Sequence, residues 1–353
     1  MRSSTKRGFR IRHIWFGVLV GTFAGAAAGA LTSVLDNIYF LPPTIRGIVI
    51  GGIIGACIVF YEEYLFQTRF RRKSYLFLLI NRIILYVLTF SFWLILVNTV
   101  SIIIEYDQTF GSAFYNAVLG GTFIRDIIIV SISALIIISF MQINRLYRKG
   151  DLFNFITGKY SKPSETDRIF LFLDLKSSTS IAEKLGNINY SNFLIDYYYD
   201  LTEAILNSKA DIYQYVGDEI VLTWPYDKGI KDANCINCYF DIRNTFELIK
   251  DTYISKYGIY PKFKAAAHGG KVVITWIGDI KKEIVFHGDV LNTAKRMQDK
   301  CTELGQSFLI SHSLMDKIEL PSYCKSEFAG EIQLRGKADL VSLYGLKYVT
   351  DDQ

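Results

Sequence analysis

The chain has 353 residues, of which 50% are apolar and 21% charged, with a formal net charge of +5. This composition is too apolar for an ordinary soluble protein, and the length allows two structural parts. The basic residues flank apolar segments and do not alternate with aromatic residues on one face, which argues against nucleic acid as a partner.

Four apolar segments occupy the first part of the chain, at 14–35, 45–66, 76–104 and 124–143. Each has the roughly 20 residues that a helix needs to cross a bilayer. We therefore predict a transmembrane domain over 1–144 with four helices. The first segment also has features of a signal peptide, but its apolar run continues through Leu35, beyond the roughly 7–15 residues of that signal.

Basic clusters mark one side of these segments, at residues 2–12, 69–73 and 145–149, whereas the loops near Asp36 and from Glu105 to Gly121 are acidic or neutral. By the positive-inside rule, both termini are predicted to be cytoplasmic. The predicted location is the cell (inner) membrane, with a multi-pass topology and the lipid bilayer as a partner. Arg82 is expected to snorkel to the cytoplasmic surface.

Glycines recur every four residues in the first two segments, at 17, 21, 25 and 29 and at 47, 51 and 55. Such rows let helix backbones approach closely. Two interpretations stay open: packing of these two helices within one chain, or a contact between two chains.

The second part begins with a juxtamembrane linker at 145–167 and continues as a domain at 168–353. Its pattern predicts a strand at 168–175, a helix at 178–208, a hairpin at 211–224, a helix at 230–256, strands at 262–275 and 283–287, a helix at 290–302, and then short strands. This order predicts an α+β sheet of the split β-α-β, ferredoxin-like type with helices on one face.

The chain has five cysteines, and four of them lie in this second part, where reduced thiols are expected. Cys235 and Cys238 form a lone C-x-x-C in a helix-like stretch. No second pair or nearby histidine accompanies them, which favours a packed helix face over zinc or redox chemistry.

Two carboxylates are predicted to converge at one edge of the sheet. Asp174 ends the strand RIFLFLD, and Asp218 follows Gly217 in the turn of the hairpin IYQYVGDEIVLTW. In a split β-α-β sheet the first strand lies beside that hairpin. Paired carboxylates suit Mg²⁺, which borrows further oxygens from substrate phosphates. Ser180-x-x-Glu183 fits a capping box at a helix start that exposes N–H groups to phosphate.

The segments FLFLDLKSST, YVGDEIVL, AHGGKVVITWIGDI and HGDVLNTAKR, in this order and spacing, resemble class III adenylate/guanylate cyclases over roughly 165–348. The resemblance implies a membrane-anchored enzyme that converts ATP to 3′,5′-cyclic AMP and pyrophosphate, as a phosphorus–oxygen lyase in intracellular signalling. It also implies two metal ions per site, Mg²⁺ or Mn²⁺, and a homodimer in which each site takes residues from both chains.

The resemblance assigns roles to individual positions. Asp174, Asp218 and the carbonyl of Leu175 match the metal ligands. In Gly288-x-x-x-Asn292-x-x-x-Arg296, Asn292 and Arg296 match the ribose-orienting asparagine and the transition-state arginine, although alone they read as a solvated helix face. Arg335 replaces a lysine that contacts the triphosphate. Further substrate contacts are expected at the helix start, from Lys176, Ser177, Ser178 and Thr179.

Base recognition departs from the family pattern. Gln214 stands where adenylate cyclases typically carry lysine and guanylate cyclases glutamate, and Val285 stands where the former carry aspartate or threonine. ATP is the predicted substrate because the guanine-reading glutamate is missing. Guanylate cyclase is one alternative, and a membrane sensor that binds nucleotide without turnover is another. A diguanylate cyclase also has a Gly-Asp-Glu hairpin, but the Asn292 and Arg296 spacing has no reason to exist in that family.

Overall fold

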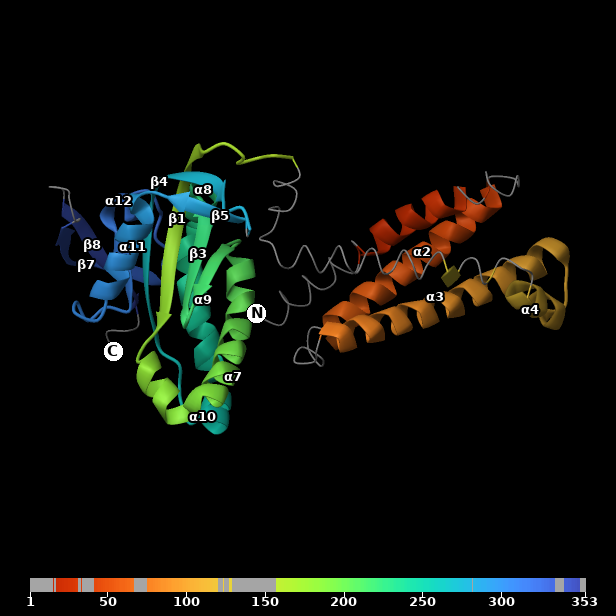
Figure 1. Ribbon diagram of the computed structural model, residues 1–353, viewed down its shortest axis with the longest axis horizontal. Coiled ribbons are helices and arrows are strands. Elements are labelled where there is room, and N and C mark those ends of the chain that lie inside the picture. Colours follow the sequence, from red (N-terminus) through yellow and green to blue (C-terminus); the bar gives the residue numbers. More distant parts are fainter. Residues whose placement is uncertain are drawn as a thin grey trace. The chain divides into compact units, whose positions relative to one another are not determined.

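The computed structural model describes residues 15, 17–30, 33, 41–66, 75–119, 123, 127–128, 157–280, 282–333 and 340–349. The chain divides into two compact units, Met1–Ile143 and Asn144–Gln353, and each is described by itself (Figure 1).

The first unit is helical. An apolar helix covers Gly17–Ala30, and it is followed by α2 (Leu41–Tyr61), the π-helix η1 (Glu62–Phe66), α3 (Tyr75–Tyr106) and α4 (Phe110–Leu119). Two described stretches, Thr44–Tyr61 and Leu76–Tyr106, are long and apolar enough to cross a membrane.

The prediction of four spans is therefore supported for two, not four. The described part of the first predicted span is a shorter helix, and the fourth span, 124–143, lies almost wholly outside the described residues. The predicted loop from Glu105 to Gly121 is corrected in part, because it contains α4. Asp107, with φ 51°, lies between the end of α3 and the start of α4, and such left-handed backbone breaks a helix.

The two glycine rows face each other within one chain. A Cβ atom on Gly21 would lie 2.0 Å from the carbonyl oxygen of Gly51, and one on Gly25 would lie 1.9 Å from that of Gly47. Only glycine permits this approach. The structure therefore supports the interpretation that the rows pack these two helices within one chain.

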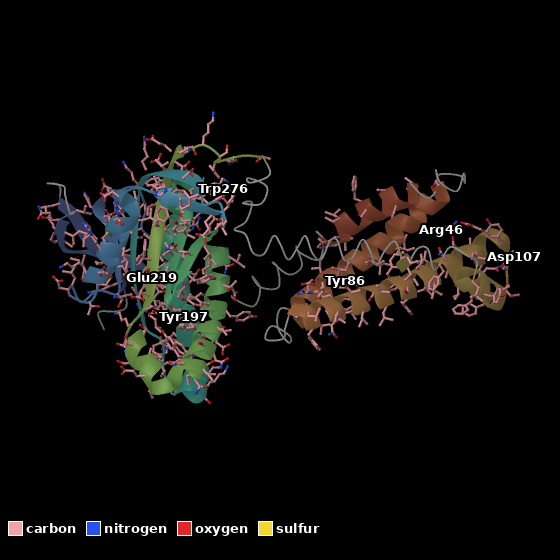
Figure 2. All side chains as sticks on the ribbon, viewed as in Figure 1. Arg46, Tyr86, Asp107, Tyr197, Glu219 and Trp276 are labelled. Carbon is pink, nitrogen blue, oxygen red and sulfur yellow. The ribbon has the colours of Figure 1, made fainter. Side chains whose placement is uncertain are left out.

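Arg82 does not snorkel as predicted. It is buried, with only 3% of its surface exposed, and its Nε lies 2.8 Å from Oε1 of Glu62 at the start of the π-helix. The hydroxyl of Tyr86 donates to the same carboxylate at 2.7 Å. The carboxylate of Glu62 thus compensates the charge of the buried guanidinium. Toward the other ends of α2 and α3, Arg46 pairs with Glu105 at 3.0 Å (Figure 2 labels Arg46 and Tyr86).

The second unit is built on an eight-stranded sheet. Its strands run in the order β2-β3-β1-β4-β6-β8-β7, and β5 pairs with β4. All pairs are antiparallel except β4 with β6. The bounds are β1 Ser164–Leu175, β2 Asp211–Val216, β3 Glu219–Pro225, β4 Phe263–Ile277, β5 Glu283–His287, β6 Phe308–Ser311, β7 Cys324–Gln333 and β8 Leu340–Tyr348.

The helices of this unit are α7 Ser178–Asn207, α8 Tyr226–Ile230, the 3₁₀ turn η2 Lys231–Ala233, α9 Asn234–Leu248, α10 Lys250–Tyr257, α11 Asp289–Lys300 and α12 His312–Met315. The crossover from β1 through α7 to the β2–β3 hairpin, which lies beside β1, is the predicted split β-α-β arrangement. The single helix predicted at 230–256 is instead divided, because Asp232 and Ala233 adopt left-handed backbone and α9 ends at Leu248.

Both faces of the sheet are covered, which corrects the expectation of helices on one face. Ile169 and Leu171 of β1 pack with α7 and α9, whereas Phe170 and Phe172 pack against Val290 of α11. We call these the α9 face and the α11 face. Residues 168–173 of β1 are all buried, as expected for a strand enclosed on both sides.

Cys235 and Cys238 confirm the prediction of a packed helix face. Both are free and buried in α9, and burial raises the pKa of each thiol to about 12. Within the described part of the chain, no three His, Cys, Asp or Glu side chains are grouped to hold a metal.

Candidate active site

The β2–β3 hairpin presents Asp218 in a turn of two residues. Val216 pairs with Glu219, and Gly217 between them has φ 64°, a value that a glycine at the first central position of such a turn readily adopts. The hydroxyl of Tyr198, on α7, donates to the carbonyl oxygen of Gly217 at 2.8 Å. The hairpin predicted from sequence is therefore present, and α7 anchors its turn.

The turn brings Asp218 to Asp174 at the end of β1. Leu173 of β1 lies opposite Ile220 of β3, so Asp174, the next residue of β1, lies beside the turn that carries Asp218. Burial raises the pKa of Asp174, and a hydrogen bond and the like charge of Asp218 raise it further. Two carboxylates in contact repel when both are ionised, and a divalent cation relieves that repulsion.

A lysine lies on the other side of Asp174. Lys264 is directly opposite Asp174 in the β1–β4 register, and its Nζ lies 3.4 Å from the Oδ2 atom of Asp174. The lysine opposes the rise in the pKa of Asp174 but does not reverse it. Lys264 was not among the residues predicted from the sequence, because its pairing with β1 follows from the sheet order alone.

The segment after Asp174 leads into α7. The side chain of Leu175 is a buried hydrocarbon with no ligating atom, so its backbone carbonyl is the candidate ligand. Lys176 donates from its Nζ to the Oγ atom of Ser307 at 2.9 Å. Burial lowers the pKa of Lys176, and the neighbouring ammonium groups of Lys262 and Lys264 act in the same direction.

The predicted capping box at Ser180 is wrong. The helix begins at Ser178, and its N-cap residue is Ser177, which adopts left-handed backbone (φ 59°) and makes no side-chain capping bond. The chain turns into the helix directly after β1, so Ser180 already lies in the first turn. Ser177 and Thr179 are exposed and Ser178 is half-buried, all at the start of α7.

Asn292 and Arg296 lie on α11, as the i, i+4 spacing predicts. Asn292 is exposed and Arg296 is half-buried. Arg296 lines a cavity of about 480 Å³, together with Asp299, Lys300, Glu303, Glu331, Ile332 and Gln333. Arg335, the predicted triphosphate contact, lies outside the described residues.

The same helix is tied to the hairpin by an ion pair that sequence reasoning missed. Lys295 donates from its Nζ to Oε2 of Glu219 at 2.6 Å, and Glu219 directly follows Asp218 (Figure 2 labels Glu219). The carboxylate of Glu219 precedes the apolar run of β3, and this position indicates that it pairs with a cation. The sequence alone does not identify that cation as Lys295.

The predicted base-reading residues lie on neighbouring elements. Gln214 is exposed on β2 beside a register shift, and Val285 is half-buried on β5. Their sequence neighbours are in contact, because the rings of Tyr213 and Phe286 are 5.2 Å apart. The fold thus brings β2 and β5 close to each other, but side chains alternate along a strand, so Val285 lies on the face of β5 opposite to Phe286.

The two groups of predicted residues form no direct polar bond with each other in the described part of the chain. Asp174 and Asp218 are in contact, but among the described residues neither Asn292 nor Arg296 forms a hydrogen bond or ion pair with either aspartate.

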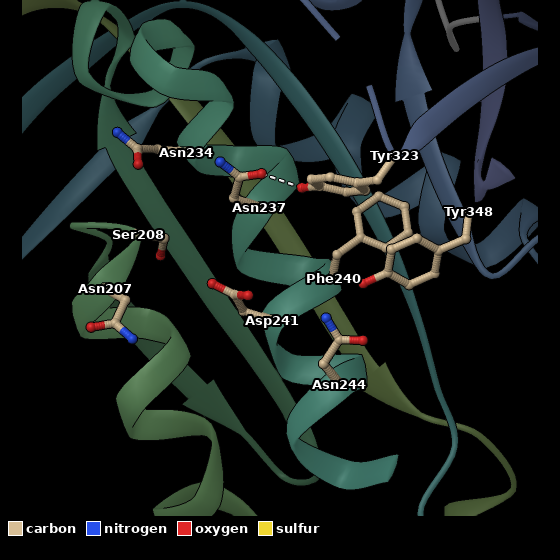
Figure 3. Close-up of a pocket in the computed structure, with 9 residues that line it drawn as sticks. All are labelled: Asn207, Ser208, Asn234, Asn237, Phe240, Asp241, Asn244, Tyr323 and Tyr348. Carbon is tan, nitrogen blue, oxygen red and sulfur yellow. Dashed lines mark hydrogen bonds between the residues drawn. The ribbon is translucent and has the colours of Figure 1, made fainter. Parts of the chain in front are cut away.

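A cavity of about 450 Å³ lies elsewhere, on the α9 face, and none of the predicted site residues lines it (Figure 3). Several of its polar groups already have partners. Asn234 donates to the carbonyl of Lys228, and Asn237 donates to the carbonyl of Asp232 and accepts from the hydroxyl of Tyr323.

Comparison with known proteins agrees with this geometry. Residues 161–347 match the model of the adenylate and guanylate cyclase catalytic domain. The chain is 34% identical over 210 residues to "Adenylate cyclase 2" of Rhizobium meliloti (strain 1021), and 25% identical over 184 residues to "Adenylate cyclase" of Anabaena cylindrica.

The matched regions cover 60% and 50% of this chain, but only 58% and 36% of those two proteins. A bacterial light-regulated adenylyl cyclase of known structure shares the fold, with a TM-score of 0.52 and 15% identity over 62% of this chain and 64% of its own. Because the matched domain spans more than half of the sequence, the chain belongs to the adenylate and guanylate cyclase catalytic domain family.

Proposed function

We propose that the protein is a membrane-bound adenylate cyclase that converts ATP to 3′,5′-cyclic AMP and pyrophosphate. The observation that carries this proposal is the contact between Asp174 and Asp218 at the edge of the sheet. Family membership and the 34% identical relative named "Adenylate cyclase 2" support the same activity.

The donor set fits the divalent metal that the family uses. Asp174 and Asp218 offer hard oxygen ligands, and burial and the neighbouring Asp218 together raise the pKa of Asp174, effects that a bound cation would oppose. We assign Asp174, Asp218 and the carbonyl of Leu175 as ligands of Mg²⁺ or Mn²⁺, two ions per site. When bound, these ions would acidify the ribose 3′-hydroxyl and neutralise charge on the triphosphate.

The remaining residues position the substrate. Asn292 orients the ribose, and Arg296 donates to the α-phosphate as negative charge develops there. Lys176 and the N–H groups of residues 177–179 at the start of α7 hold phosphate oxygens, and Arg335 contacts the triphosphate. Gln214 and Val285 face the base.

Assembly as a homodimer completes this site. Within the described part of one chain, neither Asn292 nor Arg296 forms a hydrogen bond or ion pair with either aspartate, so a second chain would supply these two residues. The two described spans support membrane anchoring. We further propose that the protein has four membrane spans and that both termini and the catalytic domain are cytoplasmic.

The test uses the purified full-length protein with Mn²⁺ and either ATP or GTP. Asp174→Asn and Asp218→Asn should each lower cyclic AMP formation by at least about 100-fold while the fold is retained, since each loses a metal ligand. Asp167→Asn is the matched control, because Asp167 lies exposed on the same strand. Turnover at the wild-type rate by either site variant contradicts the metal assignment.

The same assay separates the alternatives. A preference for GTP would indicate a guanylate cyclase, and two GTP joined into one product would indicate a diguanylate cyclase. Nucleotide binding without turnover would indicate a sensor.

A further inference from the structure

Lys264 lies at the proposed metal site and is not among the residues to which the sequence resemblance assigns a role. Its Nζ lies 3.4 Å from Oδ2 of Asp174, and both side chains are only 19% exposed. A lysine this deeply covered is uncommon without an acidic partner. Asp174 is the only carboxylate with which Lys264 forms an ion pair within the described part of the chain.

The surroundings of Lys264 hold its ammonium group at Asp174. Lys176 is close enough for its charge to interact with that of Lys264, and the Nζ atom of Lys176 donates a hydrogen bond to Ser307. Lys262 adds a third positive charge nearby. Repulsion among these lysines opposes movement of Lys264 toward them, so the carboxylate of Asp174 is its favourable neighbour.

We propose that Lys264 is the resident counter-cation of the metal site, and that a divalent ion binds Asp174 only as the ammonium group of Lys264 moves away. This inference rests on the proposed function, because it takes Asp174 as a metal ligand. Lys264 then acts as a positioning residue that sets metal affinity. The ammonium group of Lys264 lowers the affinity of the site for the divalent ion. It also offsets the negative charge of Asp174 and Asp218 while no ion is bound.

The prediction is that removing the charge strengthens metal binding. An ammonium group within a few ångströms of a bound divalent ion repels it, and at a partly buried site that repulsion reduces affinity by about tenfold or more. Lys264→Met should therefore bind Mn²⁺ about tenfold more tightly than the wild type. Lys264→Arg keeps the charge and should bind within about twofold of the wild type.

The experiment is a titration of the full-length protein in detergent with Mn²⁺ alone, in which free Mn²⁺ is measured by electron paramagnetic resonance. Lys271→Met is the matched control. Lys271 lies on the same strand and pairs with Glu165 of β1 at 3.2 Å, but its side chain is 64% exposed and lies outside the site. This variant should bind Mn²⁺ as the wild type does.

Asp174→Asn separates failure of this inference from failure of the proposed function. If Asp174→Asn binds Mn²⁺ as well as the wild type, Asp174 is not a metal ligand and the proposed metal site is wrong. If Asp174→Asn weakens binding but Lys264→Met does not strengthen it, only the role of Lys264 is overturned. Equal strengthening by Lys271→Met would also overturn it. Lys264→Gln replaces Lys264→Met if the latter fails to fold, with thermal unfolding as the check.

Discussion

Lys295 on α11 donates to Glu219 of β3 at 2.6 Å, and this contact joins the helix that carries Asn292 and Arg296 to the residue that follows Asp218. In the proposed dimer these two groups of one chain serve two different sites. The ion pair therefore links the two sites through a single protein chain.

Lys295→Met should destabilise the second unit by about 1–3 kcal/mol, because it leaves the buried carboxylate of Glu219 without its partner. Burial raises the pKa of Glu219, and Lys295 opposes that rise, so the variant raises the pKa further. When a carboxyl has a higher pKa in the folded than in the unfolded state, the protein becomes less stable as pH rises above the pKa of the unfolded state. The loss of stability of Lys295→Met relative to the wild type should therefore be larger at pH 7 than at pH 4, as measured by thermal unfolding.

The double variant Glu219→Gln/Lys295→Met is the control for that experiment. It removes both charges and should be more stable than Lys295→Met alone. A double variant that is no more stable than the single one would mean that the unpaired charge of Glu219 does not cause the loss of stability.

Asp218→Asn should stabilise the metal-free protein at pH 7 by a few tenths to about 1 kcal/mol, the range for partly exposed charge pairs. The raised pKa of Asp174 comes first from burial and then from Asp218. The folded state therefore holds its proton more tightly, and stability falls as pH rises through the window above the unfolded pKa of about 3.9. Unfolding midpoints in a metal chelator should differ at pH 7 and converge near pH 3. A lower midpoint for the variant at pH 7 would contradict this reading.

Gln214→Lys should raise the ratio of kcat/KM for ATP over GTP by about tenfold, because lysine only donates hydrogen bonds and would face the donor groups of guanine. Val285→Asp, which restores the residue typical of adenylate cyclases, should shift the ratio in the same direction. Steady-state kinetics with both nucleotides measures the effect. An unchanged ratio in both variants would place base recognition on other residues.

Co-expression of two defective chains tests the dimer. Asp174→Ala and Asn292→Ala/Arg296→Ala should each be inactive alone, because each homodimer loses one half of both sites. A mixed dimer retains one complete site, and random pairing makes half of the dimers mixed. Activity should recover to roughly a quarter of wild type by symmetric-dimer counting. No recovery, with mixed dimers shown to form by pull-down, would mean that the site is built within one chain.

In the first unit, Arg82→Met should lower stability by about 3–5 kcal/mol, because it leaves Glu62 as an uncompensated buried charge. Arg46→Met is the comparison. Its pair with Glu105 is about one-third exposed, so its loss should cost at most about 1 kcal/mol. Thermal unfolding in detergent measures both. Equal effects would mean that the buried pair contributes no more than the exposed one.

Much of the site could be predicted from the sequence because the signals are local. The turn at Gly217-Asp218, the apolar strand that ends at Asp174 and the spacing of Asn292 and Arg296 on a helix each depend on residues a few positions apart. The order of these elements also predicted that β1 lies beside the hairpin. Arg335 and almost all of the fourth apolar segment lie outside the described residues, and their predicted roles stay predictions.

The sequence by itself thus determined two long apolar helices, the split β-α-β order and the convergence of Asp174 and Asp218. Only the tertiary structure decided the partners of the charged groups. Glu219 and Lys295 are 76 positions apart, and Glu62 and Arg82 are 20 apart, so no local pattern connects them. The same holds for α11 on the opposite face of the sheet and for Lys264 beside Asp174. A buried charge must have a partner, but which one it has depends on how the whole chain folds.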